Sequence, residues 1–435
     1  MAILRAVQSD GSPPLVMLHG GPGGPGGVRF FPPAIAQGRM NQGRDVVIYD
    51  QRGAGLSEPK LCPEYVNVGM ATRDLPTREA RDSLWVAGAR DCVASLKAQG
   101  IDPAAYNTTT DGQDLAELRA ALGYASWDVY SGSYGARLAQ EIMRRDPRGV
   151  RAVVLASPVT RGPATHIEEP LSIQHALERI FAACDSQPAC HDAFPGLETD
   201  FYALYADLQR SPLMVPVERN DTSETALLDG DRLIGQLRQL INRGRRRIPL
   251  LLHQLRHGDT LRAARMMVGD GVQEAAFDAQ VLNNLVYCYD EYSPSYQAAA
   301  DSINALVKPP FQGKGDRSDC VIWVDRFADS SEREPIHSDI PTLILAGHFD
   351  DRTPPEHARR IASTLGRAYV YELPNEAHGA RPAGCHLSIL TQFLKDPFHE
   401  PDASCIAAIP PVTFFTRWEE IPATTTPPPA FALPQ

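Results

Sequence analysis

Residues 127–145 read WDVYSGSYGARLAQEIMRR, in which a strand, a sharp turn and a helix follow one another directly. The run Trp127–Tyr130 is typical of a buried strand, and Gly135–Arg145 repeats apolar residues at helical spacing. Between them, the small residues of Ser131–Gly135 allow a turn so tight that the side chain of Ser133 is pushed out above the sheet. The order predicts an exposed serine at the end of a core strand.

The turn matches the pattern G-x-S-x-G, except that Ser131 stands at its first glycine. A serine is small enough to keep the turn at that position. In a strand–turn–helix context the pattern is typical of a nucleophilic serine, which here is Ser133. The alternative interpretation is a loop of small residues without a chemical role.

Short apolar runs rich in β-branched residues recur in the first and last parts of the chain. They are near-continuous rather than alternating, as strands buried on both faces require. Helical patterns lie between them, and one of these opens at Asp111 and stops at Gly123. This alternation predicts a mostly parallel α/β sheet with right-handed crossovers. The predicted strands are Leu15–Leu18, Val46–Tyr49, Trp127–Tyr130, Ala152–Ala156, Thr342–Ala346 and Tyr369–Leu373.

The middle of the chain, residues 158–338, differs because helical patterns dominate it, and the strand pattern resumes only at Thr342. We therefore predict one α/β domain, made of residues 1–157 and 339–435, that is split by a helical insertion. The Pro- and Thr-rich end from Ile421 is typical of a loose tail. Predicted helices of the insertion include His175–Ala183, Ala226–Asn242 and Ile248–Val268.

The composition excludes several classes of protein. Of 435 residues, 43% are hydrophobic and 22% are charged, which suits a chain with a large buried core. The net charge is 42 − 53 = −11, which disfavours a nucleic-acid partner. No apolar run approaches the roughly 18 residues of a membrane-spanning helix. No motif for a nucleotide, a flavin or a metal occurs, so we predict no cofactor.

The chain has eight cysteines. None forms C-x-x-C or lies beside histidines at zinc-finger spacing, so the cysteines predict no metal site. Their even number and wide spread favour disulfides and a secreted or periplasmic protein, with free buried thiols in the cytoplasm as the alternative. Sequence does not fix the connectivity, and pairing in chain order is our hypothesis: Cys62–Cys92, Cys184–Cys190, Cys288–Cys320 and Cys385–Cys405.

A glycine-rich stretch, HGGPGG at residues 19–24, directly follows the predicted strand Leu15–Leu18. When a serine attacks a carbonyl group, the oxyanion that forms needs two backbone N–H donors aimed at it in advance. One comes from the residue after the nucleophile, here Tyr134, and the other from a glycine-rich loop after an earlier strand. Gly20 and Gly21 are the candidates, because a glycine backbone can approach a substrate closely.

Two polar groups that could activate the serine follow the late strands in the order that this chemistry requires. Asp350 comes after the predicted strand Thr342–Ala346, and His378 comes after Tyr369–Leu373. Both lie just past the carboxyl ends of their strands, where open α/β sheets hold their active sites. We predict that His378 takes the proton of Ser133, and that Asp350 orients the imidazole and stabilises its charged form.

Neighbouring residues compete for these two roles. Asp351 is adjacent to Asp350 and is the other candidate for the acid. His348 and His386 lie nearby in the sequence, but neither has the placement of His378 after the following strand.

Several motifs occur along the chain in a fixed order. They are HGGPGG (19–24), YDQRGAGLSEP (49–59), SGSYGARLAQ (131–140), LILAGHFDDRTPP (343–355) and EAHG (376–379). With these motifs the sequence resembles the α/β-hydrolase superfamily, and more narrowly the proline iminopeptidase and tripeptidyl-aminopeptidase-like serine peptidases. Residues 385–406, CHLSILTQFLKDP…PDASCI, resemble the TAP-like C-terminal segment of that family. The resemblance implies an α/β-hydrolase fold with a mostly parallel sheet flanked by helices and an inserted helical cap.

The resemblance also bears on individual residues. The usual family pattern has proline where Asp351 stands, which favours Asp350 as the acid. An aminopeptidase must bind a free α-ammonium group, and similar members have an acidic residue just after the cysteine found here as Cys288. Asp290 is the first candidate for this role and Glu291 the second, with solvation of a cap surface as the alternative.

The resemblance implies a serine hydrolase that works through an acyl-enzyme, most nearly an exopeptidase that releases N-terminal residues or short peptides. A carboxylesterase or lactonase would use the same groups on a small ester. A non-catalytic α/β-hydrolase that serves as a binding module is the alternative from another class. Family members have strands ahead of the one at Leu15, and no signal peptide is visible, so we expect a trimmed start. The oligomeric state stays open.

Overall fold

The structure is a computed structural model, and it describes residues 1–24, 40–72, 75, 77–162, 164–219, 222–269, 280–312, 317–379 and 383–422. The chain forms two compact units. The first unit consists of Met1–Ser172, Gln273–Val307 and Gln312–Ile409, and the second of Ile173–Val272, Lys308–Phe311 and Pro410–Gln435. The division into residues 1–157, 158–338 and 339–435 stays a prediction.

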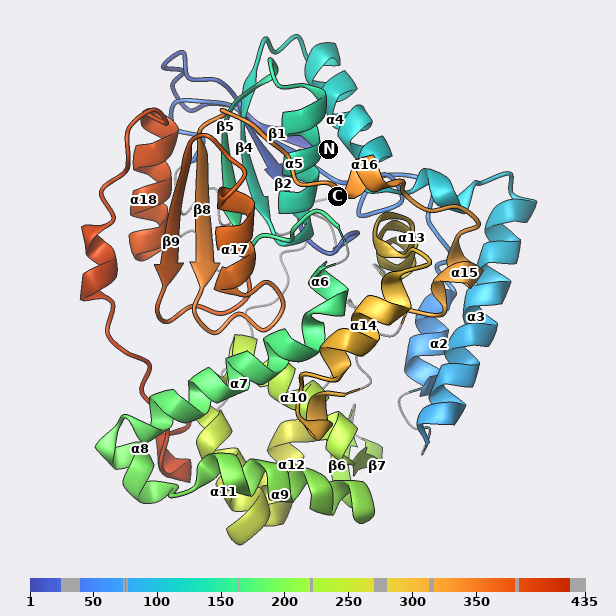
Figure 1. The fold of residues 1–435 in the computed structure, drawn as a ribbon, viewed down its shortest axis with the longest axis vertical. Helices are drawn as coiled ribbons and strands as arrows, with labels where there is room; N and C mark the ends of the chain where they lie inside the picture. The colour runs from blue at the N-terminus through green and yellow to red at the C-terminus, as the bar shows by residue number, and fades with distance from the viewer. Residues whose placement is uncertain are drawn as a thin grey trace. The chain divides into compact units, whose positions relative to one another are not determined.

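The first unit contains a seven-stranded sheet (Figure 1). The strand order is β1-β3-β2-β4-β5-β8-β9, and every neighbouring pair is parallel except β1 and β3. This confirms the predicted mostly parallel sheet; the short antiparallel strand β1 was not expected. The strands are β1 (Ala2–Leu4), β2 (Leu15–Leu18), β3 (Val46–Tyr49), β4 (Trp127–Gly132), β5 (Val150–Ala156), β8 (Thr342–Gly347) and β9 (Ala368–Leu373).

Helices cover both faces of this sheet. Alternate residues of each strand point to opposite sides, and the strands carry apolar side chains on both sides that must be buried. Val16 and Leu18 of β2 pack in a core with residues of α3, α4, α5 and α17, whereas Leu15 and Met17 pack in another with α18. The labels α17 and α18 in Figure 1 accordingly stand on either side of β8 and β9. These helices are α3 (Arg78–Ala98), α4 (Thr108–Ala121), α5 (Tyr134–Arg145), α17 (Pro355–Ala362) and α18 (Gly384–Lys395).

Helix α4 begins earlier than predicted. The side chain of Asn107 accepts a hydrogen bond from the backbone N–H of Thr110 at 2.8 Å, so the N-cap lies ahead of the expected Asp111. The predicted stop at Gly123 is confirmed, since this residue has a φ of +75° just past the helix end. The remaining helices of the first unit are α2 (Tyr65–Thr72), α6 (Ala164–Ile167), α13 (Gln280–Glu291), α14 (Tyr296–Asn304), α15 (Cys320–Trp323) and α16 (Ser330–Arg333).

The second unit is mostly helical but holds an antiparallel hairpin that the sequence did not reveal. Ala226 was expected in a helix, but it pairs with Val215 in the hairpin, and Asp229 then caps a helix that begins at Gly230. The expected helix Ile248–Val268 is interrupted at Gly258. The elements are α7 (Glu169–Asp185, from the end of the first unit), α8 (Pro188–Ala193), α9 (Leu197–Arg210), β6 (Leu213–Arg219), β7 (Thr222–Leu228), α10 (Gly230–Arg243), α11 (Ile248–His257) and α12 (Thr260–Gly269).

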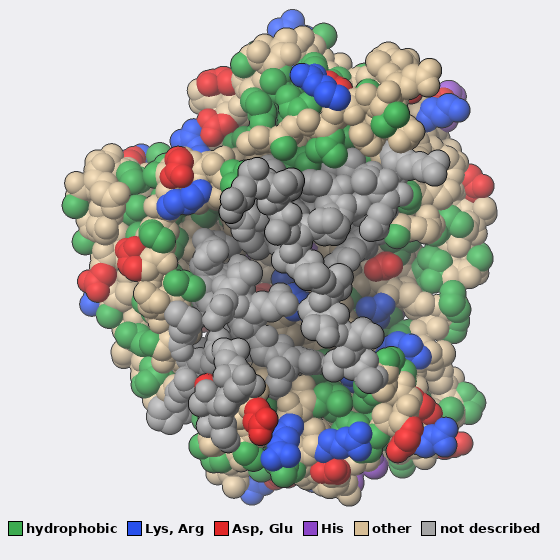
Figure 2. All heavy atoms as spheres, turned by 180° about the vertical axis from the view of Figure 1, so that it is seen from behind, with side chains coloured by type: hydrophobic (Ala, Val, Ile, Leu, Met, Phe, Trp, Pro, Cys, Tyr) green, Lys and Arg blue, Asp and Glu red, His purple; other side chains and the backbone are tan. Residues whose placement is uncertain are grey.

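All eight cysteines form disulfides, in the four pairs that chain order suggested: Cys62–Cys92, Cys184–Cys190, Cys288–Cys320 and Cys385–Cys405. Four disulfides are consistent with an extracellular or periplasmic protein. Among the described residues, no helix has the length and apolar character needed to cross a membrane. On the face seen in Figure 2, acidic and basic side chains of described residues lie interspersed.

Candidate active site

Ser133 stands at the corner between β4 and α5, in a backbone conformation that only a few per cent of residues other than glycine adopt. Its φ is +54° and its ψ is −123°. Three backbone hydrogen bonds hold this corner: the N–H of Ser133 donates to Ala156, and its carbonyl accepts from Ala136 and Val159. Strain of this kind persists only where the surrounding structure enforces it, and it clusters at functional sites.

Small residues around the corner let the helix approach the sheet. A Cβ atom on Gly135 would lie 2.5 Å from the carbonyl oxygen of Leu18, so glycine is required at the start of α5. Ser131 fits in the place of the usual glycine because its hydroxyl, which is fully buried, donates to the carbonyl of Val154 at 2.8 Å. The departure from the G-x-S-x-G pattern thus leaves no unsatisfied group.

The structure brings Ser133, His378 and Asp350 into one hydrogen-bonded line. His378 Nε2 lies 2.9 Å from the Oγ of Ser133. On the other side of the ring, His378 Nδ1 lies 3.1 Å and 3.0 Å from the two carboxylate oxygens of Asp350. The imidazole is therefore placed to accept the serine proton at Nε2 while the carboxylate holds Nδ1 protonated.

Asp350 is fully buried and held from several directions. The backbone N–H groups of Arg352 and Thr353 and the hydroxyl of Thr353 donate to it at 2.9, 2.8 and 2.8 Å. Burial raises the pKa of this carboxyl, but the ion pair with His378 and the hydrogen bonds outweigh it, so the pKa of Asp350 lies below its usual value. Asp350 is thus a fixed anion beneath the imidazole.

The competing residues lie in other environments. Asp351 is also buried, whereas both carboxylate oxygens of Asp350 lie within hydrogen-bonding distance of the His378 ring. His348 Nδ1 lies 2.6 Å from Glu372. His386 is buried on α18 in the core of the opposite sheet face, where burial lowers its pKa to about 4.

The glycine-rich loop lies against the serine. A Cβ atom on Gly20 would come within 2.8 Å of Ser133 Cβ and 3.3 Å of its Oγ, so the backbone of Gly20 lies directly against the side chain of Ser133. The loop is held by the amide of Gln51, whose oxygen accepts from the N–H of Gly23 at 3.1 Å. The third candidate donor, Tyr134, is fully buried at the first position of α5.

Helix α13 contacts the same loop. The amide of Asn283 and the hydroxyl of Tyr287 donate to the carbonyl of Gly21 at 3.1 and 3.4 Å. The oxygen of Gly21 therefore has partners on α13, which fixes the direction of the peptide next to the serine. Neither contact was predictable from the sequence, because each joins residues more than 250 positions apart.

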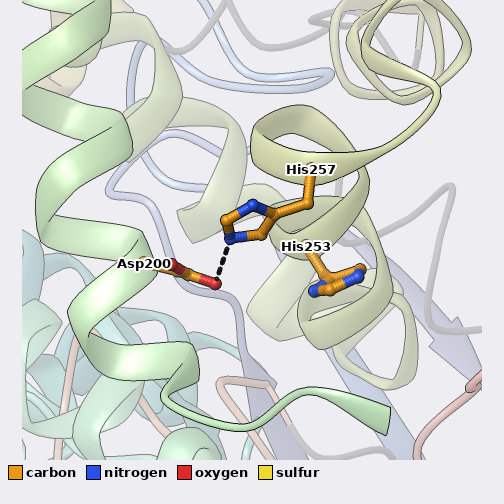
Figure 3. Close-up of side chains that lie close together, drawn as sticks. All are labelled: Asp200, His253 and His257. Carbon is orange, nitrogen blue, oxygen red and sulfur yellow. Dashed lines mark hydrogen bonds and ion pairs between the residues drawn. The ribbon is translucent and has the colours of Figure 1, made fainter.

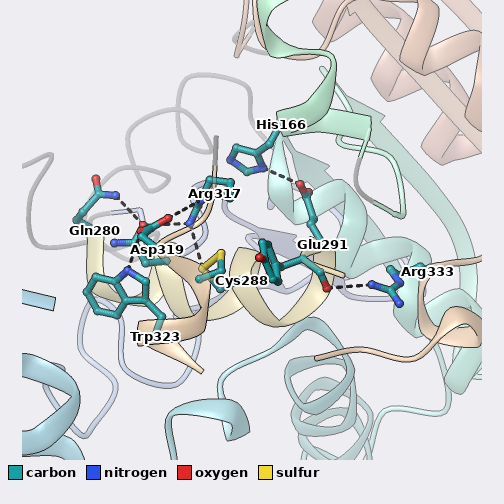
Figure 4. Close-up of a disulfide and its surroundings, with 11 residues drawn as sticks. His166, Gln280, Cys288, Glu291, Arg317, Asp319, Trp323 and Arg333 are labelled. Atoms are coloured by element: carbon teal, nitrogen blue, oxygen red, sulfur yellow. Dashed lines mark hydrogen bonds and ion pairs between the residues drawn. A yellow bond between two sulfur atoms is a disulfide. The ribbon is translucent and has the colours of Figure 1, made fainter. Parts of the chain in front are cut away.

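The two candidate amine-binding carboxylates lie at the end of α13, and both are buried. Asp290 accepts from the N–H and hydroxyl of Thr108 and lies 3.7 Å from Arg137. Burial raises its pKa to about 6. Glu291 accepts from Arg137 at 2.6 Å and contacts His166 at 2.7 Å (Figure 4). Both carboxylates thus belong to one buried charged network.

Arg137 is the centre of this network, and sequence reasoning passed over it. Its guanidinium also donates to the backbone carbonyls of Thr160 and Gly162 at 2.9 and 2.6 Å. The available signal was the charged Arg137 itself, within the motif SGSYGARLAQ at the start of a helix. Figure 4 shows Glu291 on the same helix, α13, as the disulfide-bonded Cys288.

Comparisons with known proteins agree with the α/β-hydrolase fold. A family model described as alpha/beta hydrolase fold matches residues 13–188, and one described as TAP-like protein matches residues 310–405. A proline iminopeptidase of Arabidopsis thaliana is 30% identical over 155 residues, which are 34% of this chain and 28% of that protein. One of Neisseria gonorrhoeae is 27% identical over 154 residues, which are 34% of each chain.

These alignments cover about a third of the curated relatives. Among solved structures, a proline iminopeptidase of Mycobacterium smegmatis is 15% identical and has a TM-score of 0.43, covering 91% of this chain and 94% of that one.

Proposed function

Because the chain belongs to the α/β-hydrolase family, with a TAP-like segment near its end, we propose that it is a serine hydrolase whose nucleophile is Ser133. The observation that carries the proposal is the hydrogen-bonded line Ser133–His378–Asp350, with 2.9 Å between the serine oxygen and the imidazole. This is the arrangement that general-base activation of a serine requires.

In the proposed reaction, His378 accepts the proton of Ser133 as the serine oxygen attacks the substrate carbonyl. The resulting oxyanion accepts hydrogen bonds from the backbone N–H of Tyr134 and from that of Gly20 or Gly21, each typically worth roughly 3 kcal/mol of the barrier. His378 then gives its proton to the leaving group, which departs and leaves an acyl-enzyme. Water, deprotonated by the same imidazole, releases the acid and restores Ser133.

We propose that the substrates are short peptides with a free N-terminus. The names of the relatives and the TAP-like segment support this class of substrate. A further support is charge: the two carboxylates of Asp290 and Glu291 share the guanidinium of Arg137, so the acidic groups outnumber the arginine that they contact. An α-ammonium group would complement that charge.

We also propose that the predicted insertion, residues 158–338, acts as a cap that restricts entry to short substrates. The contacts of Asn283 and Tyr287 with Gly21 support this role, because they join one helix of the insertion, α13, to the glycine-rich loop at residues 19–24. The disulfides support a secreted or periplasmic location.

The proposal is tested by comparing kcat/KM on aminoacyl and tripeptidyl anilides, the same peptides with an acetylated N-terminus, and short-chain nitrophenyl esters. We expect the free-amine peptides to be preferred. Asp290→Asn, which keeps a hydrogen-bonding group toward Thr108, should raise KM for free-amine peptides far more than for acetylated ones. An equal rise in KM for free-amine and acetylated peptides would show that Asp290 does not bind the amine. A preference of the unsubstituted protein for esters would indicate a carboxylesterase instead.

A further inference from the structure

Outside the candidate active site, three side chains able to bind a metal meet between two helices of the second unit. Asp200 comes from the first turn of α9, and His253 and His257 come from α11. One ligand atom from each lies within 4.8 Å of the other two. Figure 3 shows the carboxylate of Asp200 extending from its helix toward the two imidazoles on the other.

The spacing along α11 places both imidazoles on one side of that helix. Residues at i and i+4 lie one above the other on a helix surface, with Cβ atoms about 5–6 Å apart. The rings of His253 and His257 are accordingly 5.2 Å apart, centre to centre. Since α9 packs against α11, Asp200 completes a three-sided arrangement.

Each of the three groups is already oriented by its neighbours. The Oδ2 atom of Asp200 faces His257 Nε2 at 2.8 Å, while its Oδ1 lies 3.5 Å from the Nε of Arg256, which also pairs with Asp207. One oxygen thus contacts a positioning cation, and the other is directed at the imidazoles. Partners of this kind around a metal ligand fix its orientation.

His253 is held by a ring contact with Phe194 at 5.1 Å.

We propose that Asp200, His253 and His257 form a zinc site that links α9 to α11. Two imidazoles and a carboxylate, with a fourth position for water, are a ligand set that Zn²⁺ takes in proteins. All eight cysteines are in disulfides, so thiolates do not compete for the ion. With Zn–N and Zn–O distances of about 2.0–2.2 Å, tetrahedral ligand atoms lie roughly 3.3 Å apart, which side-chain rotation can reach from the observed spacing.

The test uses the full chain, stripped with EDTA, exchanged into metal-free buffer and titrated with ZnCl₂ alone by calorimetry. We expect one Zn²⁺ per chain and a rise in the melting temperature on saturation. CoCl₂ in place of zinc should give the visible absorption of a four-coordinate ion with nitrogen and oxygen ligands.

Variants assign the site. His257→Gln, at a side chain that is 47% exposed, and His253→Gln should each weaken zinc binding at least tenfold, whereas the matched control His191→Gln, an exposed histidine paired with Asp185, should not. Circular dichroism verifies that each variant is folded. If His253→Gln does not fold, His257→Gln alone tests the site. The proposal is overturned if the unsubstituted protein binds no zinc, or if His257→Gln binds it with unchanged affinity.

Discussion

At the scale of single residues, the candidate site depends on which of two adjacent carboxylates supports the imidazole. Asp350 contacts His378 Nδ1 with both oxygens. Asp350→Asn should reduce kcat by about 10³–10⁴-fold, because an amide can stabilise the wrong imidazole tautomer and carries no charge to balance the imidazolium. Asp351→Asn is the matched control and should stay within about tenfold of the original. Steady-state kinetics on the preferred substrate decide the question, and the reverse ranking would transfer the role to Asp351.

A second residue-scale prediction concerns the close approach of α5 to β2. Gly135→Ala places a methyl group 2.5 Å from the carbonyl oxygen of Leu18, so the helix must shift. We expect a loss of about 1–3 kcal/mol in the free energy of unfolding, together with reduced kcat, since Ser133 precedes this helix. Gly235→Ala is the control, because no atom lies within 4 Å of its added Cβ on α10. Denaturant titration of both variants measures the difference; equal stabilities would contradict the packing argument.

The residue patterns that were predictable from sequence are the local ones. The serine corner, the aspartate and the histidine each follow a strand with a recognisable motif, so their order along the chain indicated their meeting in space. The partners of Asp290 and Glu291 were not predictable, since Arg137 and Thr108 are more than 150 positions away. His253 and His257 form an H-x-x-x-H pattern within a predicted helix, but their meeting with Asp200 of another helix was not predictable from the sequence.

At the scale of elements, the buried strands were found because each is a short continuous apolar run between helices. The antiparallel pair β6–β7 was missed because Ala226–Leu228 reads equally well as the start of a helix. The break between α11 and α12 follows from Gly258-Asp259: the Asp259 side chain accepts from the N–H of Arg262 and so begins the second helix.

Helix α18 gives a prediction about pH. His386 is buried, and its pKa is lowered from 6.5 to about 4. Between these values the unfolded chain binds a proton at this residue that the folded chain does not, so protonation favours unfolding. The stability that neutral His386 contributes is present above about pH 6.5 and is lost as the pH falls toward 4, by up to about 3 kcal/mol.

His386→Leu should therefore lose less stability than the original protein between pH 7 and pH 4, when the two are compared by denaturant unfolding at each pH. His399→Ala, at a histidine that is 82% exposed, is the control and should follow the original curve. Parallel curves for His386→Leu and the original protein would show that His386 does not titrate differently on unfolding.

At the scale of the whole molecule, each of the two units contains at least one disulfide within itself. Cys184–Cys190 lies in the second unit, and the other three pairs lie in the first. Thiol titration in denaturant should find no free thiol before reduction and eight after it. Reduction should also lower the melting temperature, because removing a native disulfide typically costs about 2–5 kcal/mol. Eight thiols without reductant would contradict the oxidised state and the proposed location.

The proposed hydrolase activity requires a serine hydroxyl that is made nucleophilic by the imidazole beside it. The direct measurement is intact-mass analysis after reaction with a fluorophosphonate, for the original protein, Ser133→Ala, and a control at the exposed Ser302. We predict one added phosphonyl group on the original protein and on Ser302→Ala, mapped to Ser133, and none on Ser133→Ala. Labelling that persists in Ser133→Ala, or an original protein that does not react, would contradict the assignment of Ser133 as the nucleophile.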